Sequence, residues 1–402
     1  MKKGLIAVMT SVCALLMLVV VPIFAQPAAP KTIKIGVVDG LTGPHGTYGK
    51  RNTWGRVKAI EVINKDGGIY VKEFNRKIPM ELIQADHEAN ETKAVLSTEY
   101  LNQQGVVALT ATTAFLPTGC GVSEKYHLPA LTTVTGIQRV QEQGYRYLFS
   151  NHPKNPDFAK AFVGFLDSLP QALRPTKVAL LEEQTELGIE CVGYAQKELT
   201  SHGYKFIVTK HQKYCKDLSA QILAAKNAGA DAVYGTLMTP DGLLLVKQMK
   251  QLDYNPKAYM VQMAAGNRDA WKTLGKDGDN VLLSSHFHWS FNYPGAKELC
   301  AMYEAEFGEK PHANTPSCYA TIQILADSIK RAGSLDREKI RDALATTDMM
   351  TVCGPVKFDK NGQAIFESLP ILQYQNGVET VVWPEKLKEK PPVYPLPKWN
   401  ER

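Results

Sequence analysis

A chain of 402 residues is longer than a single hydrophobic core usually organises, so the sequence predicts two domains. Its content of 44% hydrophobic and 21% charged residues is typical of a globular protein and excludes an intrinsically disordered one. The formal net charge of +6 is distributed over interspersed acids and bases, which excludes a basic nucleic-acid-binding groove. We therefore expect no nucleic-acid partner.

The N-terminal residues have the pattern of an export signal. Two lysines precede an apolar stretch over residues 5–24, and a small-residue cleavage site ends at Ala25. We expect residues 1–25 to be a cleaved signal peptide, which places the mature chain in the periplasm or another extracytoplasmic compartment. The alternative is an uncleaved anchor, because the apolar stretch is just long enough to cross a bilayer.

After the signal, short apolar runs alternate with segments of helical periodicity in two successive series. The first series begins at residue 33 and the second at Lys177. This alternation predicts an α/β fold with two parallel sheets, each covered by helices on both faces. The segment "NHPKNP", residues 151–156, carries two prolines and separates the series, so we expect a hinge strand there.

The loop "DGLTGPHGTYGKRN", residues 39–52, follows the first strand and contains four glycines. It is not a phosphate-binding P-loop, because Pro44 stands where the first glycine is needed and Arg51 where a Ser or Thr is needed. A dinucleotide fingerprint is excluded as well, because the glycines are spaced by threes and the helix is expected to begin beyond Lys50. A plain turn with Tyr48 packing outward remains an alternative to a ligand-binding loop.

Six cysteines follow the predicted signal, an even number in an oxidising compartment: Cys120, Cys191, Cys215, Cys300, Cys318 and Cys353. They either form disulfides or stay as buried thiols, and their spacing does not determine a pairing. The sequence has no C-x-x-C pair, and "HEAN" at residues 87–90 lacks the second histidine of a zinc motif. His286 and His288 supply only two ligands, so we expect no metal and no cofactor.

Several consecutive segments carry a resemblance to a known family. They are, in chain order, "KIGVVDGLTGPHGTYGKRNTWGRVKAIEVINKDGGI", "KAVLSTEYLNQQGVVAL", "LPALTTVTG", "EQGYRYLF" and "CGPVKFDKNGQ". The chain resembles the type I periplasmic substrate-binding proteins of the branched-chain amino acid (Leu/Ile/Val) ABC-transporter family, from about residue 32 to residue 376. The resemblance implies two doubly wound parallel-sheet lobes joined by three crossover segments.

The resemblance also implies the division of the chain and its role. It assigns residues 31–153 and 286–362 to an N-terminal lobe, residues 154–285 and 363–384 to a C-terminal lobe, and leaves 385–402 as a tail. The lobes are expected to close on a small-molecule solute and deliver it to the membrane subunits of an ABC permease. We expect a monomer without enzymatic activity. The alternatives are a ligand-sensing receptor module of the same fold and, more distantly, an exported hydrolase.

The resemblance implies that several residues of the first lobe bind the carboxylate of the ligand. The resemblance places Tyr48 over the ligand, and Thr112 and Thr113 on the hydroxyl-bearing loop that holds the carboxylate. It implies a backbone contact at Val134, and Thr135 is the nearest hydroxyl to a family threonine that is Gly136 here. Hydroxyls and amides suit a carboxylate because they donate hydrogen bonds without a buried countercharge. Strand propensity and helix capping are the alternative reasons for these threonines.

The second lobe departs from the family pattern. Leu187 and Met238 replace aromatic residues, and Met263 replaces the glutamate that binds the ammonium of amino-acid ligands. A thioether cannot pair with a buried ammonium, so we predict a carboxylate-bearing, apolar or aromatic solute without a free α-amino group. If Asp269 or Glu186 provides the missing charge instead, the solute is a branched-chain or aromatic amino acid.

One further residue is placed near the site by the family register. His288, next to Trp289, lies near the second crossover and is expected to border the cleft.

Overall fold

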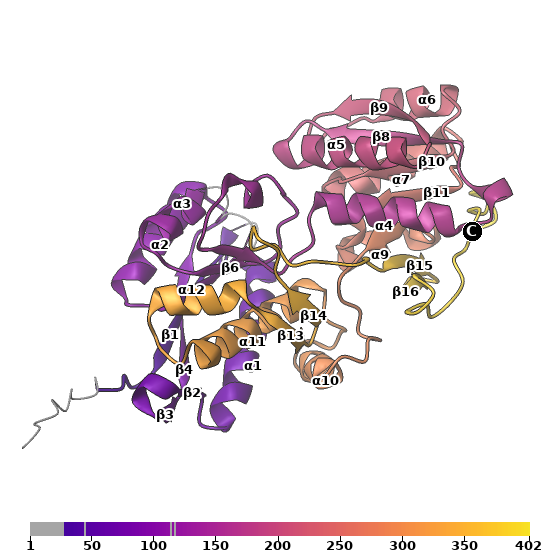
Figure 1. The fold of residues 1–402 in the computed structure, drawn as a ribbon. Coiled ribbons are helices and arrows are strands. Elements are labelled where there is room, and N and C mark those ends of the chain that lie inside the picture. The colour runs from indigo at the N-terminus through magenta and orange to yellow at the C-terminus, as the bar shows by residue number, and fades with distance from the viewer. Residues whose placement is uncertain (1–27, 44–45, 113–114, 116–117) are drawn as a thin grey trace, which may run out of the picture.

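The computed structural model describes residues 28–402 except 44–45, 113–114 and 116–117. The predicted signal peptide, residues 1–25, and the predicted site residue Thr113 therefore lie outside the described residues. The rest of the chain forms two lobes, each built on its own sheet (Figure 1).

The first lobe contains a five-stranded parallel sheet in the order β4-β1-β5-β6-β7. Its strands are β1 (Ile33–Asp39), β4 (Met80–Asp86), β5 (Ala108–Ala111), β6 (Ala130–Thr132) and β7 (Leu148–Ser150). One face is covered by α1 (Gly46–Lys65), α10 (Ala296–Phe307), α11 (Asn314–Ala332) and α12 (Arg337–Ala345). The other face is covered by α2 (Glu91–Gln103) and α3 (Thr118–Lys125). Strand β1 is buried on both sides, which explains its almost uninterrupted apolar sequence.

The second lobe contains a seven-stranded sheet in the order β16-β15-β12-β11-β10-β8-β9. Its strands are β8 (Lys177–Glu183), β9 (Lys205–His211), β10 (Ala232–Gly235), β11 (Ala258–Val261), β12 (Leu282–Ser284), β15 (Ile371–Gln375) and β16 (Val378–Trp383). The first five are parallel, as the sequence predicts, whereas β15 and β16 add an antiparallel edge.

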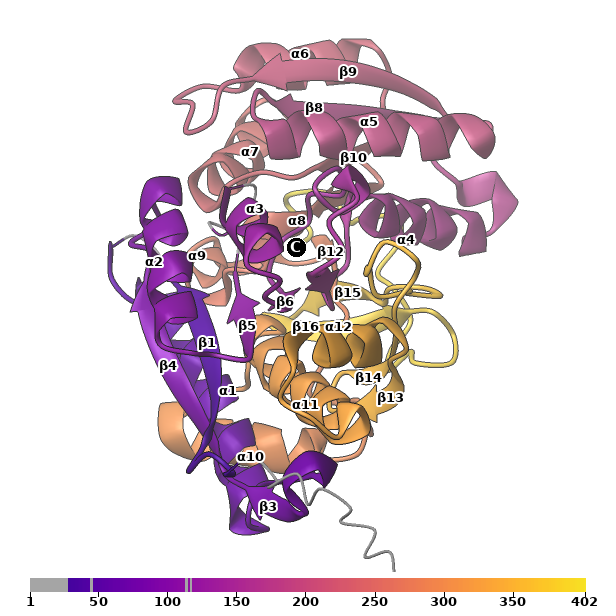
Figure 2. The same ribbon diagram turned by 60° about the vertical axis from the view of Figure 1, so that its left-hand side comes forward.

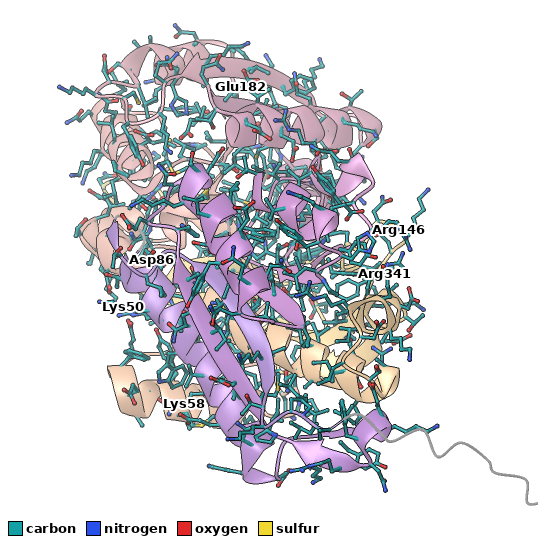
Figure 3. All side chains as sticks on the ribbon, turned by 90° about the vertical axis from the view of Figure 1, so that its left-hand side faces the viewer. Lys50, Lys58, Asp86, Arg146, Glu182 and Arg341 are labelled. Carbon is teal, nitrogen blue, oxygen red and sulfur yellow. The ribbon has the colours of Figure 1, made fainter. Side chains whose placement is uncertain are left out.

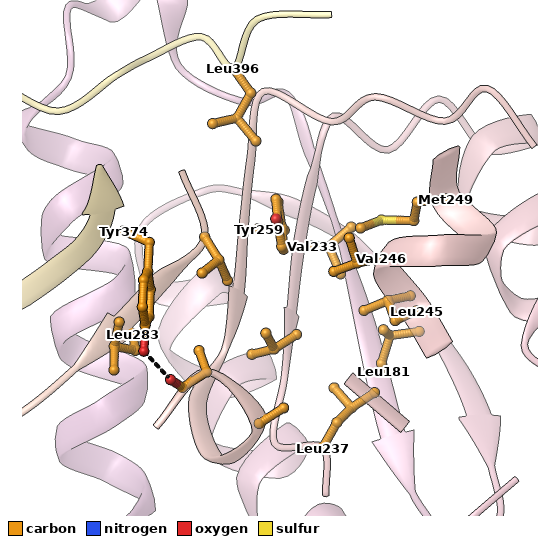
Figure 4. Packing of buried hydrophobic residues seen from close by; sticks show 14 of the residues in the cluster. Leu181, Val233, Leu237, Leu245, Val246, Met249, Tyr259, Leu283, Tyr374 and Leu396 are labelled. Atoms are coloured by element: carbon orange, nitrogen blue, oxygen red, sulfur yellow. Dashed lines mark hydrogen bonds between the residues drawn. The ribbon is translucent and has the colours of Figure 1, made fainter. Parts of the chain in front are cut away.

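Helices cover both faces of the second sheet as well. On one face lie α4 (Asn155–Ser168) and α5 (Glu186–Ser201), and on the other lie α6 (Ser219–Asn227), α7 (Thr239–Gln251), α8 (Gln262–Ala265) and α9 (Arg268–Lys272). Figure 4 shows Leu245, Val246 and Met249 of α7 packed beside Leu181 and Val233 of the sheet. Figure 2 shows α5, β8 and β9 at one end of the molecule and α10, α11 and β3 at the other.

Smaller elements complete the lobes. They are the hairpins β2 (Ile69–Val71) with β3 (Arg76–Ile78) and β13 (Asp348–Thr351) with β14 (Gly354–Lys357), and the short 3-10 helices η2 (Lys72–Phe74), η4 (Gln141–Gln143), η5 (Gln171–Leu173) and η6 (Gly275–Gly278).

The chain passes between the two sheets three times: after β7, after β12 and after β14. The predicted fold of two α/β lobes with three crossovers is thus confirmed, while the exact lobe boundaries stay a prediction. The first and third crossings run side by side, because Gln363 Nε2 donates a 2.9 Å hydrogen bond to the carbonyl oxygen of His152. The "NHPKNP" segment forms the first crossing and enters α4 at Asn155.

The first helix begins earlier than the sequence predicts. We expected it beyond Lys50, but α1 starts at Gly46, so the glycine-rich segment forms its first turn. A Cβ atom on Gly49 would lie 1.9 Å from the carbonyl oxygen of Gly40. Gly49 therefore allows the helix to approach the loop that follows β1, and this contact explains one of the four glycines better than a phosphate site does.

The C-terminal tail is part of the second lobe's packing. Leu396 and Trp399 belong to the core between the sheet and α7, where Figure 4 labels Leu396. Trp399 Nε1 donates to the carbonyl oxygen of Tyr254 over 3.1 Å, and the backbone amide of Val393 donates to Gln373 Oε1 over 2.8 Å. The tail therefore covers apolar surface that would otherwise face water.

The structure shows free thiols rather than disulfides at the following cysteines. Cys191, Cys215, Cys300, Cys318 and Cys353 are free. Burial raises the pKa of the Cys318 thiol to about 12, so it stays protonated and unreactive at neutral pH.

On the surface, acids and bases are interspersed, as Figure 3 shows on one side of the molecule. Within the described part of the chain, no helix has the length and apolar character needed to cross a bilayer.

Candidate functional site

A cavity of about 410 Å³ lies between the lobes, at the carboxyl ends of the parallel strands. Residues of both lobes line it: Asp39, Tyr48, Gly49, Asn52, Thr112, Val134, Thr135, Gly136, His152, Asn155, Phe158, Leu187, Thr236, Met238, Thr239, Gln262, Met263, Gly266, Asn267, Arg268, Leu283, Ser284, Ser285, His286, Phe287, His312, Ala313, Asn314, Leu372 and Glu379. Open parallel sheets commonly bind ligands at this edge, and the volume suits a small organic molecule.

The predicted residues of the first lobe meet on one wall of this cavity. Tyr48 lies in the first turn of α1 and packs edge-to-face on the ring of His312, with 6.3 Å between centroids. Val134 adopts φ = 63°, a conformation that is costly for a β-branched residue and typical of functional loops. Thr135 is 3% exposed, and its hydroxyl has no hydrogen-bond partner among the described residues. A buried, unpartnered hydroxyl on a residue that lines a cavity is a candidate for a ligand contact.

Thr112 also lines the cavity, but its hydroxyl proton is already used. The hydroxyl donates a 2.8 Å hydrogen bond to Asp39 Oδ1. Asp39 Oδ2 accepts from Arg56 NH1 over 2.6 Å, and both side chains of this ion pair are buried. Thr112 thus stabilises the Asp39–Arg56 ion pair, whose net charge is zero. Its hydroxyl has no proton left to donate to a solute.

The predicted residues of the second lobe form the opposite wall. Leu187 lies in the first turn of α5, Met238 is the N-cap of α7, and Met263 lies in α8. All three side chains line the cavity, and Met263 is 42% exposed. The structure therefore brings seven of the nine predicted residues together, with flexible apolar side chains facing the hydroxyl wall.

The other two predicted residues are not part of the described lining. Thr113 lies outside the described residues. His288 is 1% exposed, stacks on Trp289 with 3.9 Å between ring centroids, and is not among the lining residues. Its Nε2 lies 3.3 Å from the carbonyl oxygen of Glu379. The expectation that His288 borders the cleft therefore does not hold, because the second crossing turns its ring towards Trp289.

Neither acid considered for an amine partner lines the cavity. Asp269 is exposed beside Lys272, and Glu186 pairs at 2.5 Å with Arg139. Two other acids do line it, Asp39 and Glu379, and sequence reasoning missed them. Each is paired with an arginine, Asp39 with Arg56 and Glu379 with Arg268.

Arg268 connects the two lobes beside the cavity. Its Nε and NH2 lie 2.9 and 2.7 Å from Glu379 Oε2 in the second lobe. The same guanidinium donates to the carbonyl oxygens of Lys310 at 2.8 Å and Pro311 at 3.1 Å in the first lobe. It also lies over the ring of Trp289, 4.6 Å from its centroid. Arg268 therefore joins the two lobes beside the cavity through polar contacts with both.

Glu190 of α5 makes the corresponding contact at another rim. Its carboxylate accepts hydrogen bonds from the backbone amides of Gln138 at 2.7 Å and Arg139 at 3.2 Å, both in the first lobe. It also accepts from Asn155 Nδ2 at 2.9 Å. Arg268 and Glu190 thus each link the two lobes through polar contacts.

Three histidines that sequence reasoning did not assign to the cavity line it. His152 belongs to the first crossing, His286 to the second, and His312 precedes α11. The rings of His152 and His286 are 5.1 Å apart in an edge-to-face arrangement, and His286 Nε2 contacts the hydroxyl of Ser317. Burial lowers the pKa of both His286 and His312 to about 4, and burial followed by the charge of His286 lowers that of His152. The imidazoles are therefore neutral at pH 7.

The lowered pKa values predict acid sensitivity. In the unfolded chain a histidine binds a proton below about pH 6.5, whereas folded His286 stays neutral down to about pH 4. The free energy of unfolding should therefore fall as the pH drops through this window, by roughly 3 kcal/mol for His286 at 1.36 kcal/mol per pH unit. Urea unfolding at about pH 7 and about pH 4.5 measures this fall.

Matched histidine variants test its origin. His286→Gln, which can still bond to Ser317, should reduce the fall, whereas His202→Gln, at an exposed position beside Asp167 and Glu198, should not reduce it. Equal falls in the wild type and in His286→Gln would contradict the assignment to His286.

Comparisons with known proteins agree with this architecture. The family model described as "Periplasmic binding protein" matches residues 32–378. The chain belongs to this family. The binding protein is 25% identical over 404 residues to "Leu/Ile/Val-binding protein homolog 7" of Brucella suis, covering 96% of this chain and 97% of the relative. The family resemblance drawn from the sequence is thus confirmed.

Solved structures share the fold of this binding protein. A leucine-binding protein of Thermotoga maritima aligns with a TM-score of 0.74 at 22% identity, over 87% of this chain and 97% of that one. A solute-binding protein of an ABC transporter from Rhodopseudomonas palustris, solved with 3,4-dihydroxybenzoic acid, aligns with a TM-score of 0.71 at 16% identity, over 93% of this chain and 100% of that one. The family and these neighbours are binding proteins rather than enzymes.

Proposed function

We propose that this protein captures a small carboxylate-bearing, apolar or aromatic solute without a free ammonium group between its lobes and delivers it to an ABC importer. The observation that carries the proposal is the cavity itself, which is shared by both lobes. Its two walls differ: Thr135, whose buried hydroxyl has no hydrogen-bond partner among the described residues, lines it from one lobe, and Leu187, Met238 and Met263 line it from the other.

The first wall supports carboxylate binding. Besides Thr135, the amide side chains of Asn52 and Asn155 line the cavity, and all three groups are buried. Neutral donors of this kind stabilise an anion by hydrogen bonds, each contributing about 1.5–3 kcal/mol when the acceptor is charged. Loop strain at Val134 supports the same location, because non-glycine residues with positive φ are concentrated at binding sites.

The opposite wall supports the absence of an ammonium group. Leu187, Met238 and Met263 offer no anionic partner, and an unpaired buried ammonium costs several kcal/mol. The two lining acids, Asp39 and Glu379, are each held by an arginine at 2.6–2.9 Å. An ammonium would have to share these carboxylates with a guanidinium that is already in place.

One observation favours a second candidate, a branched-chain or aromatic amino acid. Glu379 lines the cavity, and its Oε1 accepts only from the hydroxyl of Tyr374, at 3.1 Å, among the described hydrogen bonds. The remaining lone pair of this oxygen is a possible acceptor for an ammonium. The Leu/Ile/Val-binding relative and the leucine-binding neighbour also support this candidate.

Leucine and its 2-oxo acid, 4-methyl-2-oxopentanoate, decide between the candidates. They share the carboxylate and the apolar body, and the 2-oxo acid has a keto group in place of the amino group. We expect 4-methyl-2-oxopentanoate, benzoate or 3,4-dihydroxybenzoate to stabilise the protein in a thermal-shift assay, and leucine not to do so. A ligand at a hundred times its dissociation constant adds about 2.7 kcal/mol of stability. Calorimetry then gives the affinities. Tighter binding of leucine than of its 2-oxo acid would overturn the proposal and favour the amino acid.

The route of the solute is proposed from the family and the N-terminal sequence. The pattern of residues 1–25 supports export, and Leu/Ile/Val-type binding proteins work with ABC permeases. A receptor module of the same fold would bind the solute equally well but would need a regulatory partner. Uptake of a labelled carboxylate that is lost on deletion of the gene supports transport, whereas unchanged uptake supports sensing.

A further inference from the structure

A buried lysine lies behind the carboxylate wall, in the first crossing. Lys154 is fully buried, and its Nζ donates a 3.1 Å hydrogen bond to the carbonyl oxygen of Thr135. The ring nitrogen Nδ1 of His152 lies 3.2 Å from the same oxygen. The lysine is thus linked through one carbonyl to Thr135, a residue that lines the cavity and whose buried hydroxyl has no partner among the described residues.

The ammonium of Lys154 has no direct countercharge. Among the ion pairs of the described residues, none includes Lys154. The nearest acids are engaged elsewhere: Asp157 Oδ2 accepts from the backbone amide of Lys154 at 2.8 Å, and Glu190 accepts from Gln138, Arg139 and Asn155. The two lining acids of the cavity are paired with arginines. A positive charge on Nζ would therefore have no ion-pair partner in the solute-free protein and would be balanced only in part by Glu190 and Asp157.

We infer that Lys154 is the residue that makes the cleft selective for anionic solutes, because a solute carboxylate at Thr135 supplies the countercharge that the free protein lacks. This inference rests on the proposed function. Lys154 acts through the Thr135 loop rather than by lining the cavity, so it is a positioning residue that also sets the charge of the site. Neutral analogues of the solute would leave the lysine uncompensated.

The inference predicts that binding takes up protons. Burial lowers the pKa of Lys154 to about 7, against smaller opposing effects of Glu190 and Asp157. At about pH 8 most of the free protein therefore holds Lys154 neutral, and an anion in the cavity raises the pKa and draws in a proton. An anion in the cavity is expected to raise the pKa of His152 and His286 as well. The other charged groups around the cluster are Glu190 on α5 and Asp157 on α4, with Asp359 beside Asp157, while Ser317 and Phe366 face it without charge.

Calorimetry in two buffers with different ionisation enthalpies tests proton uptake. The probes are 4-methyl-2-oxopentanoate, benzoate and 3,4-dihydroxybenzoate at about pH 8, and the expected uptake is a large fraction of one proton per solute. Lys154→Met should lose this uptake and bind roughly 10–100-fold more weakly, because the through-space attraction between Nζ and the solute carboxylate is lost. Lys160→Met, an exposed lysine on α4, should keep both.

Two further measurements need no ligand. They check that Lys154→Met is folded and measure the pKa of Lys154 directly. Lys154→Met should be at least as stable to urea as the wild type, because an unpaired buried ammonium is removed. An NMR titration of the ligand-free protein with labelled lysines should show one amine with a pKa near 7 that is missing in Lys154→Met. If every lysine titrates near the ordinary value of about 10.4, the inference is wrong.

The outcomes separate the inference from the proposed function. A probe that binds without proton uptake, and equally well to Lys154→Met, overturns the inference and leaves the proposed function in place. If only leucine binds, or none of the three carboxylates binds, both are overturned.

Discussion

Replacing Arg56 by leucine is expected to destabilise the protein by about 3–5 kcal/mol, the usual cost of leaving one member of a buried ion pair without its partner. Arg56 is fully buried in α1, and its guanidinium contacts Asp39 at 2.6 Å and the hydroxyl of Thr110 at 3.2 Å. Without it, Asp39 would be a buried carboxylate whose remaining partners among the described residues are Thr112 and the amide of Gly40. Urea unfolding at pH 7 measures the loss.

A second substitution separates the lost charge from lost packing. Arg56→Leu combined with Asp39→Asn removes both charges and should recover a large part of the stability. Lys58→Leu on the same helix, where the lysine forms an ion pair with the exposed Glu61 and lies 5.9 Å from the ring centroid of Trp54, should change stability by less than about 1 kcal/mol. If the double variant is as unstable as Arg56→Leu, packing rather than charge dominates at this position.

Arg268→Ala is expected to have the largest effect on solute affinity among residues that bridge the lobes. It removes the hydrogen bonds to the carbonyl oxygens of Lys310 and Pro311 and leaves Glu379 buried without its cation. The first loss is expected to favour an open cleft, because these bonds join the second lobe to the first. The second destabilises the second lobe by roughly 3 kcal/mol. We expect solute binding at least about 10-fold weaker, since a ligand must then provide the free energy of closure itself.

Small-angle scattering and calorimetry check this result, and two variants serve as controls. Arg139→Ala removes an exposed pair with Glu186 that also joins the lobes, and it should change affinity and stability little. Arg268→Ala with Glu379→Gln should regain stability but stay open, with a larger radius of gyration than the wild type. A closed, tight-binding Arg268→Ala would show that closure does not depend on this arginine.

The fold could be predicted from the sequence because β-branched runs and helical periodicity recur in two series. The antiparallel edge of β15 and β16 could not, because an edge strand has no signal that sets its direction. The start of α1 at Gly46 was missed for a related reason: glycines usually indicate a loop, but here Gly49 provides close contact with Gly40.

Site residues were predicted only where they follow the end of a strand and align with the family's site positions. Tyr48, Thr135 and Met263 reach the cavity because each follows a strand or begins a helix at the carboxyl edge of its sheet. Residues on the crossing segments, such as His152 and His286, have no periodicity that indicates which way they face. The pairing of Glu379 with Arg268 joins positions more than a hundred residues apart and leaves no local pattern.

The order in which the lobes are completed has a consequence for their folding. The first sheet needs α11 and α12 to cover its face, and the second needs β15, β16 and the tail around Trp399. Neither half can therefore gain its full core while only the first two thirds of the chain have been synthesised. Contacts between distant segments slow folding. The segments that are synthesised last, from α11 to Trp399, therefore decide when either lobe can close its core.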